Sequence, residues 1–324
     1  MTRRLLRLPN WIGDAIMVLP SLRSLRPEDE SWLGVAHSRV LPLYRATGWF
    51  DRLHAAGGAS APVALARTIR GFRPRSAVVF PRAISGALLA SLSGAPERWG
   101  WDGPLRGALL NRRVPPGDRS RPLWLEFFDL AAPLGGTVPA RPDFTLDPGP
   151  EAAARAAALV PSVPAVALAP GAVYGPAKQW PLEHFVQLCR MAKGKGWTPV
   201  VLGGRNESKA GAVLRNEGAI DLAGRTSLLE AIAVLARCAA VVTNDSGALH
   251  LARAAGTRVI ALFGSSSPAW TGPEPHEGEA LFRGLACSPC FARRCPLPGD
   301  ARMQCLRSIT PQEVLVRLEG EVSP

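Results

Sequence analysis

The feature that most constrains the fold is a regular alternation along the chain. Short apolar runs of strand length alternate with longer amphipathic segments of helical spacing. This alternation is typical of βα units, in which parallel strands are joined by helical crossovers. In the first half we expect strands at 3–8, 33–36 and 76–81 and, from a weaker pattern, 50–55, with helices such as 14–26 and 85–93. In the second half we expect strands at 164–169, 198–202, 239–243 and 258–263 and helices at 181–195, 206–216, 227–237 and 246–255.

The segment 138–164 separates the two series of βα units. Its prolines and glycines indicate a linker followed by a short Ala-rich helix. A chain of 324 residues is long enough for two domains. We therefore predict an α/β protein with two Rossmann-like, doubly wound domains, residues 1–155 and 156–324, facing each other across a cleft. Ligands in such sheets bind beyond the carboxyl ends of the strands, so the loops that follow strands should carry the chemistry.

Composition narrows the class of protein further. Apolar residues make up 47% and charged residues 20% of the chain, which indicates an ordinary globular protein and argues against disorder. No run approaches the roughly 18 apolar residues of a membrane span, and no signal-peptide cleavage site follows the first apolar run, so we expect a cytoplasmic protein. The net charge of +12 favours phosphates, anionic lipids or nucleic acid as partners, without choosing among them.

The first motif is RLPNWIGDAIM at 7–17, where an expected strand ends and a helix begins. Asp14 lies at the start of that helix, where the positive end of the helix dipole favours a carboxylate. One interpretation is that Asp14 only caps the helix, which is a common use of aspartate. The other is that Asp14 is a general base in the interdomain cleft.

The second motif is APGAVYGPAKQWPLEHF at 169–185, again directly after an expected strand. Its glycines allow a tight bend and a close approach to a ligand, and Lys178 supplies a compact positive charge suited to phosphate. The loop is neither a P-loop nor a GxGxxG fingerprint. An ordinary solvated lysine is the alternative.

The third motif covers 241–273, where a strand runs into Asn244-Asp245-Ser246-Gly247 and a helix follows. The free backbone N–H groups at such a helix start form an anion site. A second loop, 264–268, follows the next strand and could line the same pocket. His250 lies one turn into the helix and is either a ligand contact or a packed core histidine.

The fourth feature is a cluster of cysteines with the spacing C-x2-C-x4-C-x9-C. Such a cluster in a cytoplasmic chain indicates a zinc site or a local redox pair, although this is not a standard zinc-ribbon spacing. Plain reduced thiols are the alternative. The cluster consists of Cys287, Cys290, Cys295 and Cys305, whereas Cys189 and Cys238 lie in apolar helical patterns and are expected in the core.

With these motifs in order, the chain resembles the bacterial ADP-heptose:lipopolysaccharide heptosyltransferases, most closely their heptosyltransferase II branch. The resemblance spans most of the chain. It rests on PNWIGDAIM at 9–17, PGAVYGPAKQWP at 170–181, TNDSGALHLA at 243–252, FGSSSP at 263–268 and the cysteine segment 287–305.

The resemblance implies a GT-B fold and an inverting transfer of heptose from ADP-heptose onto a sugar hydroxyl of the lipopolysaccharide inner core, at the inner face of the cytoplasmic membrane. It implies that Asp14 is the catalytic base, and that Lys178 contacts the donor phosphates and takes part in catalysis. No cofactor is required, because lysine and a helix start can stabilise the departing ADP. The remaining donor-site candidates are Glu207 near the ribose, Thr226 in the stretch that passes the adenine, and Asp245, Ser246, Gly247 and His250. The acceptor-site candidates are Asn10, Arg67 and Arg70, of which the two arginines are equally explained as a solvated helix face.

Other functions remain open at this point. A transferase with the same fold could use a different sugar nucleotide or acceptor. A sugar-nucleotide epimerase would need more carboxylates and histidines around the donor, and the chain has only five histidines. A nucleic-acid-binding protein usually has a localised basic face with stacking aromatics, whereas the arginines here are scattered, so we expect no nucleic-acid partner.

Overall fold

The computed structural model describes residues 2–26, 29–56, 61–160 and 164–320. The chain divides into two compact units, Met1–Phe144 and Thr145–Pro324. This division comes earlier than the expected 155/156 boundary, which falls inside helix α7 (Pro150–Leu159). Helix α7 packs against α10 (Leu228–Leu235) of the second unit, so its contacts place it there.

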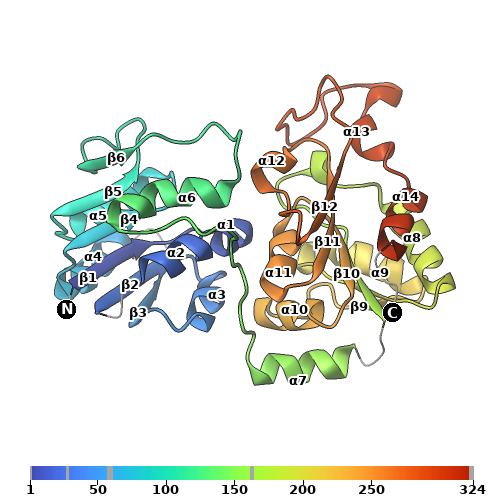
Figure 1. Ribbon diagram of the computed structural model, residues 1–324, viewed down its shortest axis with the longest axis horizontal. Helices are drawn as coiled ribbons and strands as arrows, with labels where there is room; N and C mark the ends of the chain where they lie inside the picture. The colour runs from blue at the N-terminus through green and yellow to red at the C-terminus, as the bar shows by residue number, and fades with distance from the viewer. Residues whose placement is uncertain (1, 27–28, 57–60, 161–163, 321–324) are drawn as a thin grey trace. The chain divides into compact units, whose positions relative to one another are not determined.

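Unit 1 is built around a six-stranded parallel sheet (Figure 1). Its strand order is β3-β2-β1-β4-β5-β6, the 3-2-1-4-5-6 order of a Rossmann fold. The strands are β1 (Thr2–Arg7), β2 (Glu30–Ala36), β3 (Arg52–Ala55), β4 (Ser76–Val79), β5 (Glu97–Trp101) and β6 (Arg112–Val114).

The helices of unit 1 form two layers on its sheet. Helices α4 (Ala61–Phe72) and α5 (Ile84–Leu92) pack against each other and bury Ile69, Ala87 and Leu89 against Leu5 and Val35 of the central strands. A second group, in which α6 packs against α1 and α2, consists of α1 (Ile12–Met17), α2 (Leu19–Leu25), α3 (Leu41–Ala46) and α6 (Leu123–Ala131).

Unit 2 repeats the same topology. Its parallel sheet has the order β12-β11-β10-β7-β8-β9, so that β7, the first strand of the unit, is central and next to β10. The strands are β7 (Ala165–Ala169), β8 (Thr198–Val201), β9 (Ile220–Asp221), β10 (Ala240–Asn244), β11 (Arg258–Phe263) and β12 (Gly278–Phe282).

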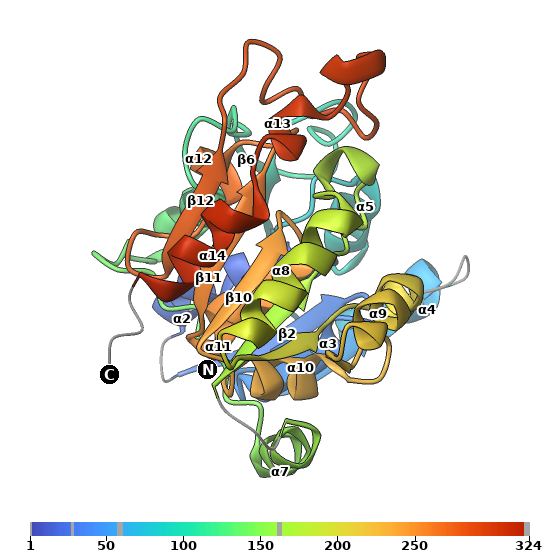
Figure 2. The same cartoon turned by 90° about the vertical axis from the view of Figure 1, so that its right-hand side faces the viewer.

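Helices cover both faces of the second sheet (Figures 1 and 2). On one face α8 (Leu182–Gly194) packs beside α9 (Ser208–Asn216) and α14 (Pro311–Glu319), and its Phe185 and Leu188 are buried with Val242 and Ile260. On the other, α11 (Gly247–Ala255) packs against α10. Two short helices, α12 (Pro268–Thr271) and α13 (Gln304–Arg307), complete the unit.

The sequence predicted most of these elements, with two kinds of difference. The expected helix 14–26 is interrupted at Val18, because Pro20 lies in the first turn of α2 and lacks the N–H that a continuous helix needs. Strands β5, β6, β9 and β12 and helices α6, α12, α13 and α14 were not predicted. Within the described residues, no helix is long and apolar enough to span a membrane.

Candidate functional site

The strand order of each sheet reverses beside its first strand. In unit 2 the reversal lies between β7 and β10, and in unit 1 it lies between β1 and β4. Because the outgoing connections there lead to opposite faces of the sheet, the loops diverge and leave a crevice at the carboxyl edge. Lys178 and Asp245 lie in the loops that follow β7 and β10, and Asp14 follows β1.

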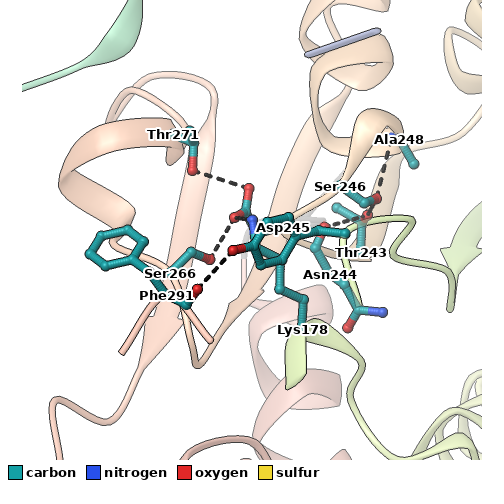
Figure 3. Close-up of polar contacts among 10 residues, drawn as sticks. Lys178, Thr243, Asn244, Asp245, Ser246, Ala248, Ser266, Thr271 and Phe291 are labelled. Carbon is teal, nitrogen blue, oxygen red and sulfur yellow. Dashed lines mark hydrogen bonds and ion pairs between the residues drawn. The ribbon is translucent and has the colours of Figure 1, made fainter. Parts of the chain in front are cut away.

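Lys178 and Asp245 form an ion pair between the Nζ and Oδ2 atoms (Figure 3). Lys178 ends the 3₁₀ turn Pro176–Lys178, and Asp245 follows β10 directly. Their side chains are 15% and 5% exposed, so the pair is largely removed from water while the lysine keeps some access to solvent. The sequence predicted both residues as donor contacts, and the structure brings them together.

The carboxylate of Asp245 has two further donors from the neighbouring loop and helix. The hydroxyl of Ser266 donates to Oδ2 at 2.5 Å, and that of Thr271 donates to Oδ1 at 3.1 Å (Figure 3). Both oxygens are therefore engaged by the protein itself. Asp245 is placed to orient the ammonium group of Lys178, and the sequence had missed Thr271 because a single threonine in a short helix carries no recognisable pattern.

Asn244, the last residue of β10, links β10 to the loop that follows β7. Its Oδ1 accepts the backbone N–H of Trp180 at 2.9 Å, and its Nδ2 donates to the carbonyl of Pro170 at 2.8 Å. Asn244 is fully buried, and Trp180 is anchored in turn by its indole N–H on the carbonyl of Ile309. The loop carrying Lys178 is thus fixed at both ends.

The start of α11 forms the third part of this site. Ser246 is its N-cap residue and accepts the N–H of Ala248 at 3.3 Å, and Gly247 is its first residue. His250 is only 3% exposed, and burial lowers its pKa to about 3. The imidazole is therefore neutral at pH 7, which agrees with the interpretation of His250 as a packed histidine and gives it no charge to offer a phosphate.

Two other predicted donor residues lie on loops of the same edge. Glu207 ends the 3₁₀ turn that follows β8. Its side chain lies close to Gly171: a Cβ atom on residue 171 would be 2.5 Å from the Cγ of Glu207. The backbone N–H of Gly224 donates to the carbonyl of Gly203 at 2.9 Å, which places the stretch containing Thr226 beside the β8 loop. No ligand contact of Thr226 follows from this placement alone.

In unit 1, Asp14 lies within the first turn of α1, two residues after its first residue. The N-cap residue is Trp11, which makes no side-chain cap hydrogen bond, so Asp14 is not the N-cap residue. Asp14 is near the buried Tyr44, whose pKa is raised well above its usual value by burial and further by the charge of Asp14. Asn10 supports the same loop, since its Oδ1 accepts from Arg7 at 3.0 Å and from the N–H of His37 at 2.9 Å.

The acceptor-site candidates Arg67 and Arg70 are not brought to this edge. Both are exposed in the second half of α4. The Nε of Arg70 donates to the carbonyl of Leu92 at the end of α5, close to where β5 begins. Helices of parallel βα units run back toward the amino ends of the strands, so these arginines lie toward the edge opposite Asp14.

The four clustered cysteines line one cavity of about 60 Å³ in unit 2. All are free thiols. Burial raises the pKa of Cys305, and the other three thiols of the cluster raise it further, so the four are electrostatic neighbours. As the side chains stand, the described part of the chain contains no group of three or more His, Cys, Asp or Glu residues that could hold a metal ion. The zinc site, one of the alternatives that the cysteine spacing left open, is therefore not preformed among these residues.

Comparison with known proteins adds to this geometry. Residues 63–300 match the family model described as glycosyltransferase family 9 (heptosyltransferase). The chain is 30% identical over 341 residues to lipopolysaccharide heptosyltransferase 2 of Escherichia coli K12, with 96% of each chain covered. It is 31% identical over 260 residues to lipooligosaccharide heptosyltransferase 2 of Haemophilus influenzae, with 75% of each covered.

A solved structure extends the likeness to the fold. The structure of Escherichia coli ADP-heptose LPS heptosyltransferase II matches with a TM-score of 0.82 and 27% identity, and the match covers 99% of this chain and 98% of that one. The expected GT-B fold and the resemblance drawn from the motifs are confirmed. This chain belongs to glycosyltransferase family 9, the heptosyltransferases.

Proposed function

We propose that this protein transfers heptose from ADP-heptose to a sugar hydroxyl of the lipopolysaccharide inner core, with inversion at the anomeric carbon. The relatives named above are lipopolysaccharide and lipooligosaccharide heptosyltransferases. The observation that carries the proposal is the Lys178–Asp245 pair, oriented by Ser266 and Thr271 at the strand reversal of the second sheet.

Lys178 and the start of α11 stabilise the charge that develops on ADP as its bond to heptose breaks. Lysine offers a compact charge, and Asp245 fixes where that charge lies before the donor arrives. The free N–H groups near Gly247 add the partial positive charge of the helix start. We assign Glu207 to the ribose and the stretch around Thr226 to the adenine, and the transfer step needs no metal ion in this scheme.

Asp14 is the base that removes the acceptor proton. Its position in the first turn of α1 places the carboxylate at the positive end of the helix dipole. Arg7 and Asn10 hold the preceding loop in place. A positioned base contributes roughly 10²–10⁴-fold to the rate. The membrane-bound precursor of the core would reach the protein at the inner face of the cytoplasmic membrane.

The test has three arms. Calorimetric titration compares ADP-heptose with ADP-glucose and UDP-glucose, and selective binding of ADP-heptose is expected. Transfer to a core acceptor is then followed by NMR, and the new linkage is expected to have the anomeric configuration opposite to that of the donor. Equal binding of all three nucleotides, or a retained configuration, contradicts the proposal.

The variant Asp14→Asn tests the base directly. We expect transfer to fall by roughly 10²–10⁴-fold, while ADP-heptose binds as before. The isosteric amide keeps the fold and removes only the basicity. Turnover within a few-fold of the parent protein would show that Asp14 is not the base.

A further inference from the structure

The segment between β12 and α13 is ordered in the structure although it buries no side chain in the hydrophobic core. Residues 283–303 contain only one short 3₁₀ turn, Gly299–Ala301, and none of their side chains is buried. Irregular segments of this length inside a domain are uncommon, and they are usually either functional or disordered linkers. Hydrophobic burial therefore does not hold the segment in place, and some other constraint is needed.

The same segment is in direct contact with the loops of the donor site. The N–H of Phe291 donates to the carbonyl of Ser265 at 2.6 Å, and the carbonyl of Phe291 accepts the hydroxyl of Tyr174 at 2.8 Å. The Nε of Arg293 donates to the carbonyl of Tyr174 at 2.9 Å, and the carbonyl of Arg293 accepts the N–H of Ala177 at 3.2 Å.

The approach of the two backbones is close enough to require a glycine. A Cβ atom at Gly175 would be 2.3 Å from the carbonyl oxygen of Arg293. The contacts with Tyr174 and Ala177 flank Gly175 and end one residue before Lys178. The segment therefore contacts the backbone of the loop that carries Lys178.

The cysteine cavity lies at this junction. Besides the four thiols it is lined by Ala177, which precedes Lys178, and by Ser265, which precedes Ser266. No carboxylate, imidazole or cationic side chain lines it among the described residues. A volume of about 60 Å³ is far too small for a sugar nucleotide and suits an ion. One thiol, Cys295, already accepts a backbone N–H, that of Met303, at 3.3 Å.

We propose that Cys287, Cys290, Cys295 and Cys305 bind one thiophilic divalent metal ion of the zinc class, and that the ion holds segment 287–305 against the Lys178 loop. Four thiolates suit a tetrahedral structural site, and thiolate ligands favour a soft or borderline ion over hard ions such as Mg²⁺. Because the thiols do not form a metal site as they stand, binding requires their side chains to rotate into other staggered rotamers. Each thiol that binds loses its proton to the solvent.

The site itself is independent of the proposed function, whereas its effect on donor binding rests on that function. The full chain is purified with a reductant and without chelator, and its metal content is measured by mass spectrometry. About one zinc per chain is expected, since structural sites bind tightly. Added Co²⁺ should replace it with the sulfur-to-cobalt charge-transfer band and the intense visible bands of tetrahedral thiolate coordination.

Two variants assign the ligands. Cys295→Ser is expected to lose the metal, whereas Cys238→Ala, which removes a buried thiol outside the cluster, is expected to keep it. Less than about 0.1 metal per chain and no cobalt spectrum would overturn the proposal, and so would a mass that shows disulfides within the cluster. Unchanged metal content in Cys295→Ser would overturn the assigned ligands.

Hydrogen exchange and ADP titration test the coupling. On metal removal we expect faster exchange in the peptide covering 171–178 and at least a tenfold loss of ADP affinity. Unchanged exchange there overturns the bracing role even if the metal is present. Failure of the metal-loaded protein to bind ADP contradicts the proposed function instead, so the two failures are distinguishable.

Discussion

Replacement of Lys178 by methionine separates the structural role of the ion pair from its role in binding. The change leaves Asp245, which is 5% exposed, without its cationic partner. Breaking a buried pair in this way costs about 3–5 kcal/mol. Asp245 keeps the hydroxyl donors Ser266 and Thr271, so we expect the lower end, about 3 kcal/mol of unfolding free energy for unit 2.

The double variant Lys178→Met/Asp245→Asn supplies the control. It removes the uncompensated charge, and we expect it to recover about 2 kcal/mol relative to the single variant, within the range measured for directly interacting pairs. ADP binding should not recover, because the cation that meets the phosphates is still missing. A charged hydrogen bond contributes about 1.5–3 kcal/mol, so both variants should bind ADP about 10–100-fold more weakly.

Stability of unit 2 is measured by urea-induced unfolding, with pulse labelling of peptides from residues 145–324, and ADP affinity is measured by calorimetry. The reasoning is refuted in two separate ways. If Lys178→Met leaves the stability unchanged, the ion pair does not carry the energy assigned to it. If the double variant binds ADP like the parent protein, Lys178 is not the phosphate ligand.

Three further predictions follow from burial and charge. Thr271→Val removes one hydrogen-bond donor from the carboxylate of Asp245 and should lower the free energy of unfolding by about 1.5–3 kcal/mol in a urea titration. ADP affinity should be nearly unchanged. An equal free-energy loss in stability and in ADP binding would contradict this prediction. Burial lowers the pKa of His250 from 6.5 to about 3, so between these pH values the imidazole binds a proton only in the unfolded state. The free energy of unfolding is therefore highest above pH 6.5 in this respect and decreases as the pH falls toward 3. Between pH 7 and 4.5 this amounts to about 2–3 kcal/mol, and His250→Gln should show a correspondingly smaller loss; identical pH profiles would remove His250 as the source. Burial raises the pKa of Cys189 to about 11 and that of Cys238 to about 12, so both thiols should stay unmodified by iodoacetamide at pH 8. The exposed thiols of segment 287–305 should react once a chelator is present, and peptide mapping distinguishes the two groups. Modification of either buried thiol in the folded protein would argue against its burial.

The fold was largely predictable because its central strands are buried on both faces. Strands such as β7, AVALA, and β11, RVIALF, stand out as apolar runs for that reason. The strands that were missed lie at or near the sheet edges and are partly exposed. β6 is RRV and β12 is GEALF, and neither needs the apolar pattern on which a sequence prediction depends.

The candidate site was predictable where a loop follows a central strand. Asp14, Lys178 and Asp245 became candidates because glycines, a charged residue and a helix start occur together in the sequence. Arg67 and Arg70 formed an equally visible basic run, yet the structure places them toward the opposite edge of the sheet. A cluster of charges along a helix shows that the helix is exposed and says nothing of which edge it approaches.

The sequence by itself determined the two series of βα units, the family and the loops that carry the candidate residues, because periodicity and local motifs are encoded by neighbouring residues. Only the tertiary structure decided which side chains contact one another. Lys178 meets Asp245 across 67 positions, Thr271 joins them from a separate short helix, and four cysteines gather at a cavity beside the Lys178 loop. These contacts depend on strand order, since adjacent strands in a parallel sheet can be distant in sequence, and no local pattern records which strands become neighbours.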